Sequence, residues 1–489
     1  MTPTPSEVRW ILTGTMLAMF LAALEQTIIA TALPPIAADL GGFDRISWVV
    51  TAYLLSATCV TPVIGKLSDL YGRRRLFGLS IVVFLVGSAL CAVAPSMDWL
   101  ILGRAVQGLG GGGVMTMAQA TVADVVPPRE RGRYSAWFAI VWAVSGVLGP
   151  VLGGLIAGKV GWPWIFWINL PFGIVALAMI DRVMRKLPVT PRAVRIDVWG
   201  IVMLVAATVA ALWVLSTART AADWTSALSL GLLGGAAIGF VAFWRWQARS
   251  PDPVIPPRFL ADRAVGPVLG SSFVIYGTYV AIAMLMPVYL QIGLGAPVEE
   301  AGILMIVLLV PSTVTAAMAG RWARRHGRYK APPLIGLAVA TLGVAGLAVQ
   351  AGGTTPWGAA VWLALVGLGI GPFFPMSMLA VQNAVTSADI GAVSGTITFA
   401  RSLGGAVLTA AVTTLQLATL AAALPEVGAV AALEELAHRD LPAAARAVVA
   451  AAFVPMLWSC AAAMMVGGAL FALAEERVLR GAAPAGATD

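Results

Sequence analysis

The chain has 489 residues, of which 59% are apolar and only 11% are charged, whereas about a quarter of the residues of a soluble protein are charged. No polar stretch is long enough to build a soluble domain of any size. The net charge of +8 does not indicate a nucleic-acid-binding protein, because Lys and Arg lie in short clusters between apolar runs. The composition therefore predicts an integral membrane protein.

Apolar runs of spanning length follow one another along the whole chain. A helix that crosses a bilayer needs about 20 apolar residues, and the runs bounded by Gly, Pro and charged residues predict fourteen such helices. They cover residues 10–32, 47–65, 76–95, 99–122, 134–157, 162–180, 197–217, 226–246, 264–290, 300–320, 332–350, 357–380, 392–421 and 447–474. We expect an all-α membrane protein.

The basic residues alternate between the two sides of the membrane. With a cytoplasmic N-terminus, 24 of the 31 Lys and Arg residues lie on the cytoplasmic side, and 5 lie on the other. Two more, Arg104 and Arg401, lie inside helices. Because cytoplasmic loops are enriched in Lys and Arg, this asymmetry predicts that both termini are cytoplasmic. The abundance of Ala and Gly hints at a bacterial source, and so at the inner (cell) membrane.

A short pattern occurs twice. Residues 65–75 read GKLSDLYGRRR and residues 320–330 read GRWARRHGRYK, each with two glycines seven residues apart and then a basic cluster. The repeat predicts two pseudosymmetric six-helix bundles, residues 1–182 and 263–480, with two inserted helices in 183–262 and a cytoplasmic tail at 481–489. A substrate site between such bundles lies near the midplane of the membrane. A tight turn that merely favours Gly and Arg is the alternative reading.

Further motifs stand in the predicted helices. They are EQT at 25–27 with ALP at 32–34, RAVQG at 104–108, GVLGPVLGG at 146–154, WIFWINLPFG at 164–173 and RSLGG at 401–405. Together with the repeat, they resemble the major facilitator superfamily, and specifically its fourteen-helix drug:proton antiporter branch. The chain departs from the pattern at Arg324, which stands where the first repeat has Asp69, so we expect the second loop to lack a carboxylate latch.

The resemblance implies the major facilitator fold and a function. We expect a proton-coupled secondary transporter, not an enzyme, that exports drugs or other hydrophobic or cationic small molecules by proton antiport and alternating access. It would need no cofactor beyond protons as the coupling ion, and it would work as a monomer. Export of lipids or amphiphiles to the outer leaflet or periplasm is the alternative, and solute symport is disfavoured by the antiporter-like segment 146–154.

Three ionisable residues inside helices are candidates for proton coupling. Glu25 is the only acidic residue well inside a predicted helix, about 10 Å below the periplasmic end. Arg104 lies at a similar depth, about 8 Å from the periplasmic side. Arg401 lies on a helix of the other bundle. Burial raises the pKa of a carboxyl and a nearby Arg lowers it, so Glu25 is suited to exchanging a proton. A static buried pair between Glu25 and Arg104 is the alternative.

The loop after the second helix is a candidate gate. Gly65 and Gly72 allow a tight turn, and Asp69 can cap a helix N-terminus or pair with a basic residue such as Arg73. Such a latch would stabilise an outward-facing state. The alternative is that the charged residues of this loop only set the orientation of the chain in the membrane. That reading explains Arg73 well and Asp69 poorly.

The glycines of 146–154 are the antiporter motif of the resemblance. Gly146, Gly149, Gly153 and Gly154 leave a helix face without side chains, where a partner helix can approach closely, and Pro150 can kink the helix. The resemblance places this helix at the bundle interface. A simple close-packed contact is the alternative.

Polar and aromatic residues within the helices are candidates for the substrate cavity. We expect Gln26, Asn169, Tyr53 and Trp142 to line it, although hydrogen bonding between helices and packing against lipid also explain such residues. Both histidines, His326 and His438, lie in loops away from any acid or Cys cluster, so no metal site is expected.

The helix that starts near residue 392 reads as unbroken to Leu424, which is about 50 Å and longer than the bilayer core of about 30 Å. The charged segment that follows leads to a helix that begins as early as Leu441. A helical hairpin that projects beyond the membrane, with Pro425 near its tip, is one reading, and an ordinary loop is the other.

Overall fold

The computed structural model describes residues 5–41, 45–126, 128–184, 197–217, 221–423 and 443–479. In these ranges the chain is helical apart from short turns, and it contains no strand. Contacts divide it into two compact units. The first comprises Met1–Trp213, Gly231–Phe259 and Val381–Phe399, and the second comprises Val214–Leu230, Leu260–Ala380 and Ala400–Asp489.

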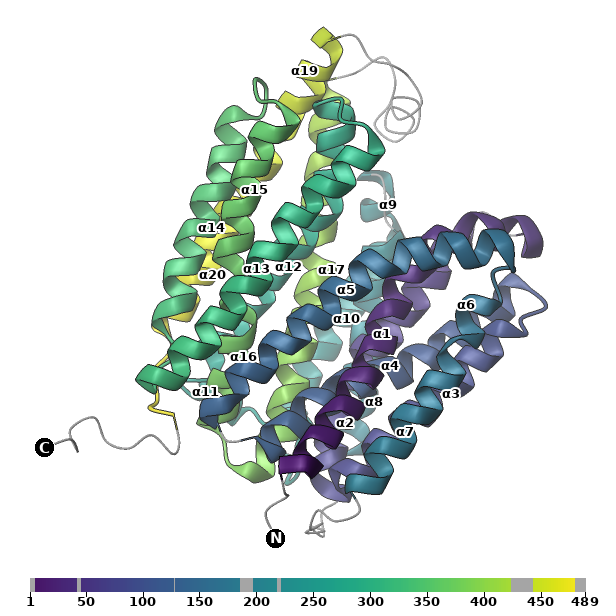
Figure 1. Cartoon of the computed structure of the whole chain (residues 1–489), viewed down its shortest axis with the longest axis vertical. Helices are drawn as coiled ribbons and strands as arrows, with labels where there is room; N and C mark the ends of the chain where they lie inside the picture. Colours follow the sequence, from purple (N-terminus) through teal and green to yellow (C-terminus); the bar gives the residue numbers. More distant parts are fainter. Residues whose placement is uncertain are drawn as a thin grey trace, which may run out of the picture. The chain divides into compact units, whose positions relative to one another are not determined.

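The first unit holds the N-terminal helices (Figure 1). They are α1 (Pro5–Leu40), α2 (Ile46–Tyr71), α3 (Arg73–Ala92), α4 (Met97–Val125), α5 (Pro128–Lys159), α6 (Trp164–Trp167), α7 (Asn169–Met184), most of α8 (Val198–Thr217) and most of α10 (Ala227–Gln247). Helix α4 packs against both α2 and α3, while α1 packs against α5 and α7. The unit also includes the η3 turn (Ser387–Asp389) and the first part of α17 (Ile390–Ala423).

The second unit holds the later helices, of which α14, α15, α13 and α20 lie side by side in Figure 1. Its elements are α9 (Ala221–Thr225), α12 (Gly266–Val288), the π-helix η2 (Tyr289–Gly293), α13 (Val298–His326), α14 (Ala331–Gln350), α15 (Pro356–Ile370), most of α16 (Phe373–Ala384), the rest of α17, α19 (Ala443–Ala452) and α20 (Val454–Leu473). The division of the chain between the two units falls within the short helix α11 (Arg258–Ala261), after Phe259.

A helix stands at each of the fourteen predicted places, but the predicted count of spans is not supported. Twelve helices among the described residues are long and apolar enough to cross a membrane, and α4 and α5 are not among them. The chain is thus a multi-pass membrane protein. Two predicted helices are interrupted: 357–380 breaks at Gly371–Pro372 and 162–180 breaks near Ile168. In both, a proline without an N–H, Pro372 or Pro171, leaves a helical hydrogen bond unmade.

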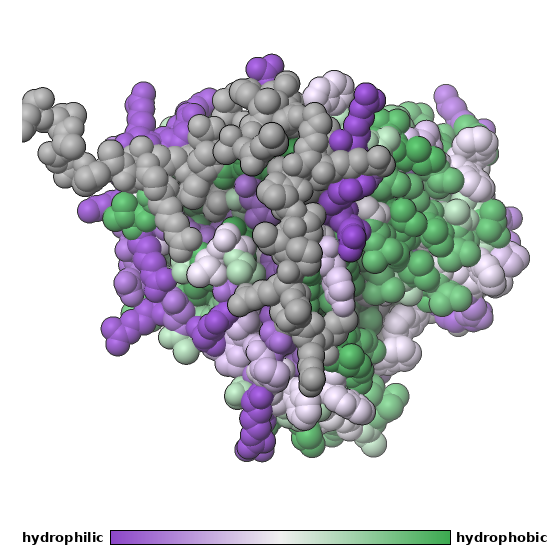
Figure 2. Space-filling view, turned by 90° about the horizontal axis from the view of Figure 1, so that it is seen from below, coloured by the Kyte–Doolittle hydropathy of each residue, from purple (hydrophilic) through white to green (hydrophobic). Residues whose placement is uncertain are grey.

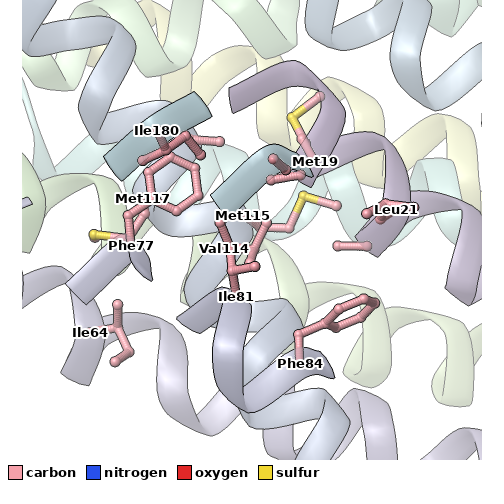
Figure 3. Packing of buried hydrophobic residues seen from close by; sticks show 14 of the residues in the cluster. Met19, Leu21, Ile64, Phe77, Ile81, Phe84, Val114, Met115, Met117 and Ile180 are labelled. Atoms are coloured by element: carbon pink, nitrogen blue, oxygen red, sulfur yellow. The ribbon is translucent and has the colours of Figure 1, made fainter. Parts of the chain in front are cut away.

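A cluster of buried apolar residues forms the core of the first unit where α1, α2, α3, α4 and α7 meet. Figure 3 shows Phe77, Met117 and Ile180 close together, with Met19 and Phe84 farther along the same cluster, and all five are at most 2% exposed. Each fully buried side chain of this size contributes about 1.5–3 kcal/mol relative to exposure in water. The packing fixes the helices that carry the polar residues of the site.

The surface of the helices is unusually apolar. In the second unit Ile335, Leu342, Val349 and Leu473 are each at least 65% exposed. Figure 2, seen from the end of the molecule that lies at the bottom of Figure 1, shows hydrophilic side chains at this end and apolar surface beside them. Side chains of this kind face lipid, because water would disfavour a contiguous apolar surface of that extent.

The inserted helices α8 and α10 are joined at one end by Asp197. Its carboxylate accepts hydrogen bonds from the N–H of Gly200 at 2.9 Å, Nε1 of Trp246 at 2.7 Å and Nε2 of Gln247 at 2.7 Å. Partial burial alone would raise the pKa of Asp197, but these hydrogen bonds outweigh it and lower the pKa below its ordinary value. Asp197 thus caps α8 and holds the end of α10.

Some predictions fall outside the described residues. The predicted hairpin tip at Pro425 and the start at Leu441 lie outside the described residues, which resume at Ala443 in α19. Helix α17 does run to Ala423, as expected.

Candidate functional site

A buried ion pair joins α1 to α4. Nη1 of Arg104 lies 2.6 Å from Oε1 of Glu25, and the two side chains are 1% and 0% exposed. The second carboxylate oxygen of Glu25 accepts a hydrogen bond from Nδ2 of Asn169, on α7, at 2.6 Å. Three helices therefore meet at one carboxylate, and the predicted proximity of Glu25 and Arg104 is found in the structure.

The guanidinium of Arg104 has further partners. It donates to Oε1 of Gln107 at 2.6 Å and to the carbonyl oxygen of Val49 at 3.0 Å, and it lies 4.5 Å from the centre of the Tyr53 ring. Nε2 of Gln107 in turn donates to Oγ of Ser88 at 2.7 Å. A buried charge is costly unless it is paired and hydrogen-bonded, and this network meets that condition on every side.

Small residues of α4 let the neighbouring helices come close to the network. A Cβ at Gly108 would lie 2.3 Å from the carbonyl oxygen of Tyr53, and a Cβ at Gly111 would lie 2.2 Å from the Tyr53 hydroxyl. On the α3 side, a Cβ at Gly110 would lie 2.2 Å from the N of Phe84. The glycine run at 110–113 is therefore a packing surface.

A second charged cluster lies at the end of α2. The carboxylate of Asp69 accepts hydrogen bonds from the N–H groups of Gly391 at 3.0 Å and Ala392 at 2.7 Å. These lie in the first turn of α17, where unpaired N–H groups and the helix dipole favour a negative charge. Asp69 also pairs with Nη1 of Arg73 at 2.5 Å, so both predicted partner types are present.

Arg73 and the two glycines complete this cluster. Nε of Arg73 lies 2.7 Å from Oδ2 of Asp124 at the end of α4. Gly72 has a φ of 89°, which only glycine adopts readily, and it separates α2 from α3. A Cβ at Gly65 would lie 2.5 Å from the carbonyl oxygen of Gly391, so α17 contacts α2 backbone to backbone.

The glycines of the predicted antiporter motif differ in their surroundings. A Cβ at Gly149 would lie 2.0 Å from Oγ1 of Thr27, and that hydroxyl donates to the carbonyl oxygen of Ser145 at 2.8 Å. Gly149 therefore permits close packing of α5 on α1. A Cβ added at Gly146 or Gly154 would meet no atom of the described residues within 4 Å, and both glycines are exposed.

The predicted cavity residues divide into two groups. Asn169 and Tyr53 are each 1% exposed and belong to the Glu25 network. Gln26 is half-buried, with Nε2 donating to the carbonyl oxygen of Ala22 at 3.4 Å, and Trp142 is 37% exposed. No group of His, Cys, Asp or Glu able to hold a metal ion occurs within the described ranges.

Arg401 lies in the second unit, on α17. Its Nη2 donates to the carbonyl oxygen of Phe374 at 2.9 Å and to Oγ of Ser377 at 2.8 Å, both on α16. The guanidinium also lies 5.5 Å from the centre of the Phe374 ring. Glu25 and Arg104 thus form one cluster, and Arg401 has surroundings of its own.

Several partners at these sites are not evident from the sequence. The pattern marks Gln107 only as one of many intramembrane polar residues, and it singles out neither Ser88 nor Asp124. Ser88 lies in the predicted helix at 76–95, and only packing shows that it faces Gln107. In the second unit Glu476 accepts hydrogen bonds from the N–H groups of Tyr329 and Lys330, both at 2.9 Å, and so supplies a carboxylate to the second repeat loop.

Comparison with known proteins identifies the family. A family model described as the Major Facilitator Superfamily matches residues 15–409. The chain belongs to this superfamily. The chain is similar to Multidrug resistance protein 3 of Bacillus subtilis, with 32% identity over 82% of this chain and 78% of that protein. It is also similar to the multidrug transporter protein MdtP of the same organism, with 33% identity over 81% of this chain and 73% of that protein.

Solved structures share the fold. A bacterial homologue of the iron transporter ferroportin in an outward-facing state aligns with a TM-score of 0.65 at 14% identity, covering 94% of this chain and 98% of that one. The proton:xylose symporter XylE aligns with a TM-score of 0.62 at 13% identity, covering 96% and 99%. These likenesses show the shared fold, and the superfamily match over residues 15–409, with the apolar helices of spanning length, makes this chain a multi-pass membrane transporter.

Proposed function

We propose that this major facilitator protein exports drugs or other small hydrophobic or cationic molecules by exchange for protons, as a member of the drug:proton antiporter branch. The observation that carries the proposal is the Glu25 carboxylate, which is wholly buried between Arg104 and Asn169. Protons are the only coupling ion required. The similarity to proteins named as multidrug transporters supports small-molecule substrates.

Glu25 has the properties of a proton carrier. Burial in a low-dielectric interior opposes a charged carboxylate, and the neighbouring Arg104 favours one. When a conformational change lengthens the Glu25–Arg104 distance or admits water, the balance between these influences shifts and the carboxyl gains or loses a proton. Proton uptake from outside and release inside then drive substrate in the opposite direction.

The latch at Asp69 supports alternating access. Helix α17 passes from the first unit into the second after Phe399, and Asp69 holds its first turn through two N–H groups. If the hydrogen bonds between Asp69 and the first turn of α17 form in one conformational state and break in the other, the latch is coupled to transport. The packing of α5 on α1 at Gly149 supports a role for the antiporter motif in limiting leakage.

We further propose that α4 and α5 cross the membrane, which gives fourteen spans. These helices have 29 and 32 residues, about 43 Å and 48 Å of helix, and they pack against α2, α3 and α1. The positive-inside asymmetry then supports cytoplasmic termini in a bacterial inner membrane. We also propose that the protein functions as a monomer.

Glu25→Gln tests the proposal. Proteoliposomes that contain the wild-type protein and an imposed pH gradient are expected to move at least one member of a panel of ethidium, another cationic drug and a fluorescent phospholipid. The variant is expected to lose gradient-driven movement of that substrate. Glu300→Gln, which removes a half-buried carboxyl at the start of α13, is the matched control and should retain it.

Two outcomes would reject parts of the proposal. Undiminished proton-driven export by Glu25→Gln for every substrate would remove Glu25 from the coupling mechanism. Movement of the phospholipid alone would favour the alternative function, lipid export, for which the long helix α17 (Ile390–Ala423) is the supporting observation.

A further inference from the structure

The surroundings of Arg401 differ from those of Arg104 in one chemical respect. Arg104 is neutralised by Glu25 at 2.6 Å, whereas no carboxylate among the described residues lies within salt-bridge distance of Arg401. The bonds of Arg401 go to neutral oxygens on Phe374 and Ser377. The second unit therefore carries a cation whose charge the described part of the chain does not balance.

The hydrogen-bonding capacity of Arg401 is also incomplete. Its Nη2 makes both described bonds, and its buried Nε has no partner among the described residues. Charged groups inside a membrane protein are costly, and they mark ion or substrate pathways. An Arg in that setting lacks both a counter-charge and an acceptor, and a carboxylate supplies the two together.

A cluster of aromatic side chains lies on one side of the guanidinium. Phe374 lies beneath it, and the rings of Tyr276 and Tyr279 contact Phe374 edge to face, with centroids 5.9 Å and 5.6 Å apart. All four residues are half-buried, while Phe373 and Ser377 beside them are fully buried. The cation and the rings thus share a partly accessible surface of the second unit, which we call the Arg401 subsite.

The backbone beside the Arg401 subsite is interrupted. Helix α15 ends at Ile370 and α16 begins at Phe373, so the span Pro356–Ala384 is discontinuous just before the residues that contact Arg401. Transporters place substrate sites at interrupted helices, and here the interruption is a local one at Pro372, since the N–H of Gly371 still donates to the carbonyl oxygen of Gly367 at 3.2 Å. The break, the unbalanced cation and the aromatic rings therefore coincide.

We propose that the Arg401 subsite binds the carboxylate of an aromatic organic acid, with the charge on Arg401 and the ring against Tyr276, Tyr279 and Phe374. This inference rests on the proposed transport function and names a substrate class for it. It differs from the expectation of cationic substrates, since a bare guanidinium repels a cation. It also gives Arg401 a role in recognition, separate from the Glu25–Arg104 pair.

Binding of 1-naphthoate to the purified full-length protein in phosphatidylcholine nanodiscs tests the proposal. The uncharged 1-naphthalenemethanol is the comparison, because it has the same ring without the carboxylate. We expect calorimetry to show the acid binding at least about tenfold more tightly than the alcohol, as a charge-assisted hydrogen bond implies. Arg401→Gln should abolish this preference and Arg401→Lys should keep part of it, because Lys retains the charge without the planar fork.

Control variants make the result specific. Arg324→Gln removes another half-buried Arg of the second unit and should leave the preference for the acid intact. Tyr279→Ala should weaken the binding of the acid and of the alcohol to the same extent, because both compounds carry the ring that contacts this side chain. Thermal unfolding of each variant confirms that it is folded, and Arg401→Lys provides a readout if Arg401→Gln does not fold.

Equal binding of acid and alcohol by the wild type, or an unchanged preference in Arg401→Gln, would overturn the proposal. Loss of naphthoate binding when phosphatidylglycerol replaces part of the phosphatidylcholine would also overturn it, since the occupant would then be a lipid headgroup. Equilibrium binding of naphthoate is measured without a pH gradient, so it does not depend on proton coupling at Glu25. A failure of proton coupling at Glu25 is therefore distinguishable from a failure of anion recognition at Arg401.

Discussion

The carboxylate of Asp69 accepts a hydrogen bond from the N–H of Ala392 at 2.7 Å, so a side chain at the end of α2 caps the first turn of α17. The two residues are 323 positions apart in the chain. Capping by a charged group satisfies N–H donors that the helix itself cannot pair. The relationship joins the start of α17 to the N-terminal helices.

Asp69→Ala is expected to destabilise the protein by about 1.5–3 kcal/mol, because buried N–H groups of Gly391 and Ala392 lose a charged acceptor. Thermal unfolding in detergent measures the change, and transport in proteoliposomes should slow. Asp98→Ala is the matched control, since the side chains of its pair with Arg45, at 2.6 Å, are 73% and 46% exposed and such pairs contribute about 0–1 kcal/mol. Equal effects of the two substitutions would contradict a capping role.

Arg104→Gln should destabilise the protein more than the double variant Glu25→Gln with Arg104→Gln. Removing Arg104 alone leaves Glu25 buried without its counter-charge, at a cost of about 3–5 kcal/mol, whereas the double variant buries no charge. A double-mutant cycle of unfolding free energies measures the difference. Additive effects would mean that the two side chains, 2.6 Å apart, are not energetically coupled.

Gly149→Ala is expected to disrupt the packing of α5 on α1, because the added Cβ would lie 2.0 Å from Oγ1 of Thr27. Overpacking of this kind costs about 1–3 kcal/mol. Gly146→Ala, three residues earlier on the same helix, meets no described atom within 4 Å and should leave the unfolding temperature unchanged. Comparable losses in both variants would show that helix α5 needs Gly for another reason.

Ionisation of Asp197 is expected to make the stability of the fold depend on pH in the acid range. Its pKa in the folded protein is lowered from the ordinary value of 3.8, so ionised Asp197 stabilises the fold at every pH above that value. The contribution is lost as the pH falls below 3.8 and through the lower folded pKa. Unfolding of Asp197→Asn should therefore show a smaller decline than wild type over this acid range, and parallel curves would contradict the prediction.

The sequence determined the class of this protein and the places of its helices. Apolar runs of spanning length lie where the helices are found, because lipid requires every backbone group to be paired within its own segment. The motifs indicated the superfamily, and the depth of Glu25 and Arg104 along their helices indicated that they meet. Such conclusions depend on local composition and on spacing along one helix, which the chain displays directly.

Only the tertiary structure decided which neighbours each polar group has. The Glu25 network includes Asn169, Gln107 and Ser88 because the helices that carry them turn their polar faces inward. Nothing in the sequence of an apolar helix specifies that rotation. The cap of α17 by Asp69 and the absence of a described carboxylate beside Arg401 depend on residues brought together from distant positions. Contacts of this kind follow from the packing of whole helices, so they become visible only once the helices are assembled.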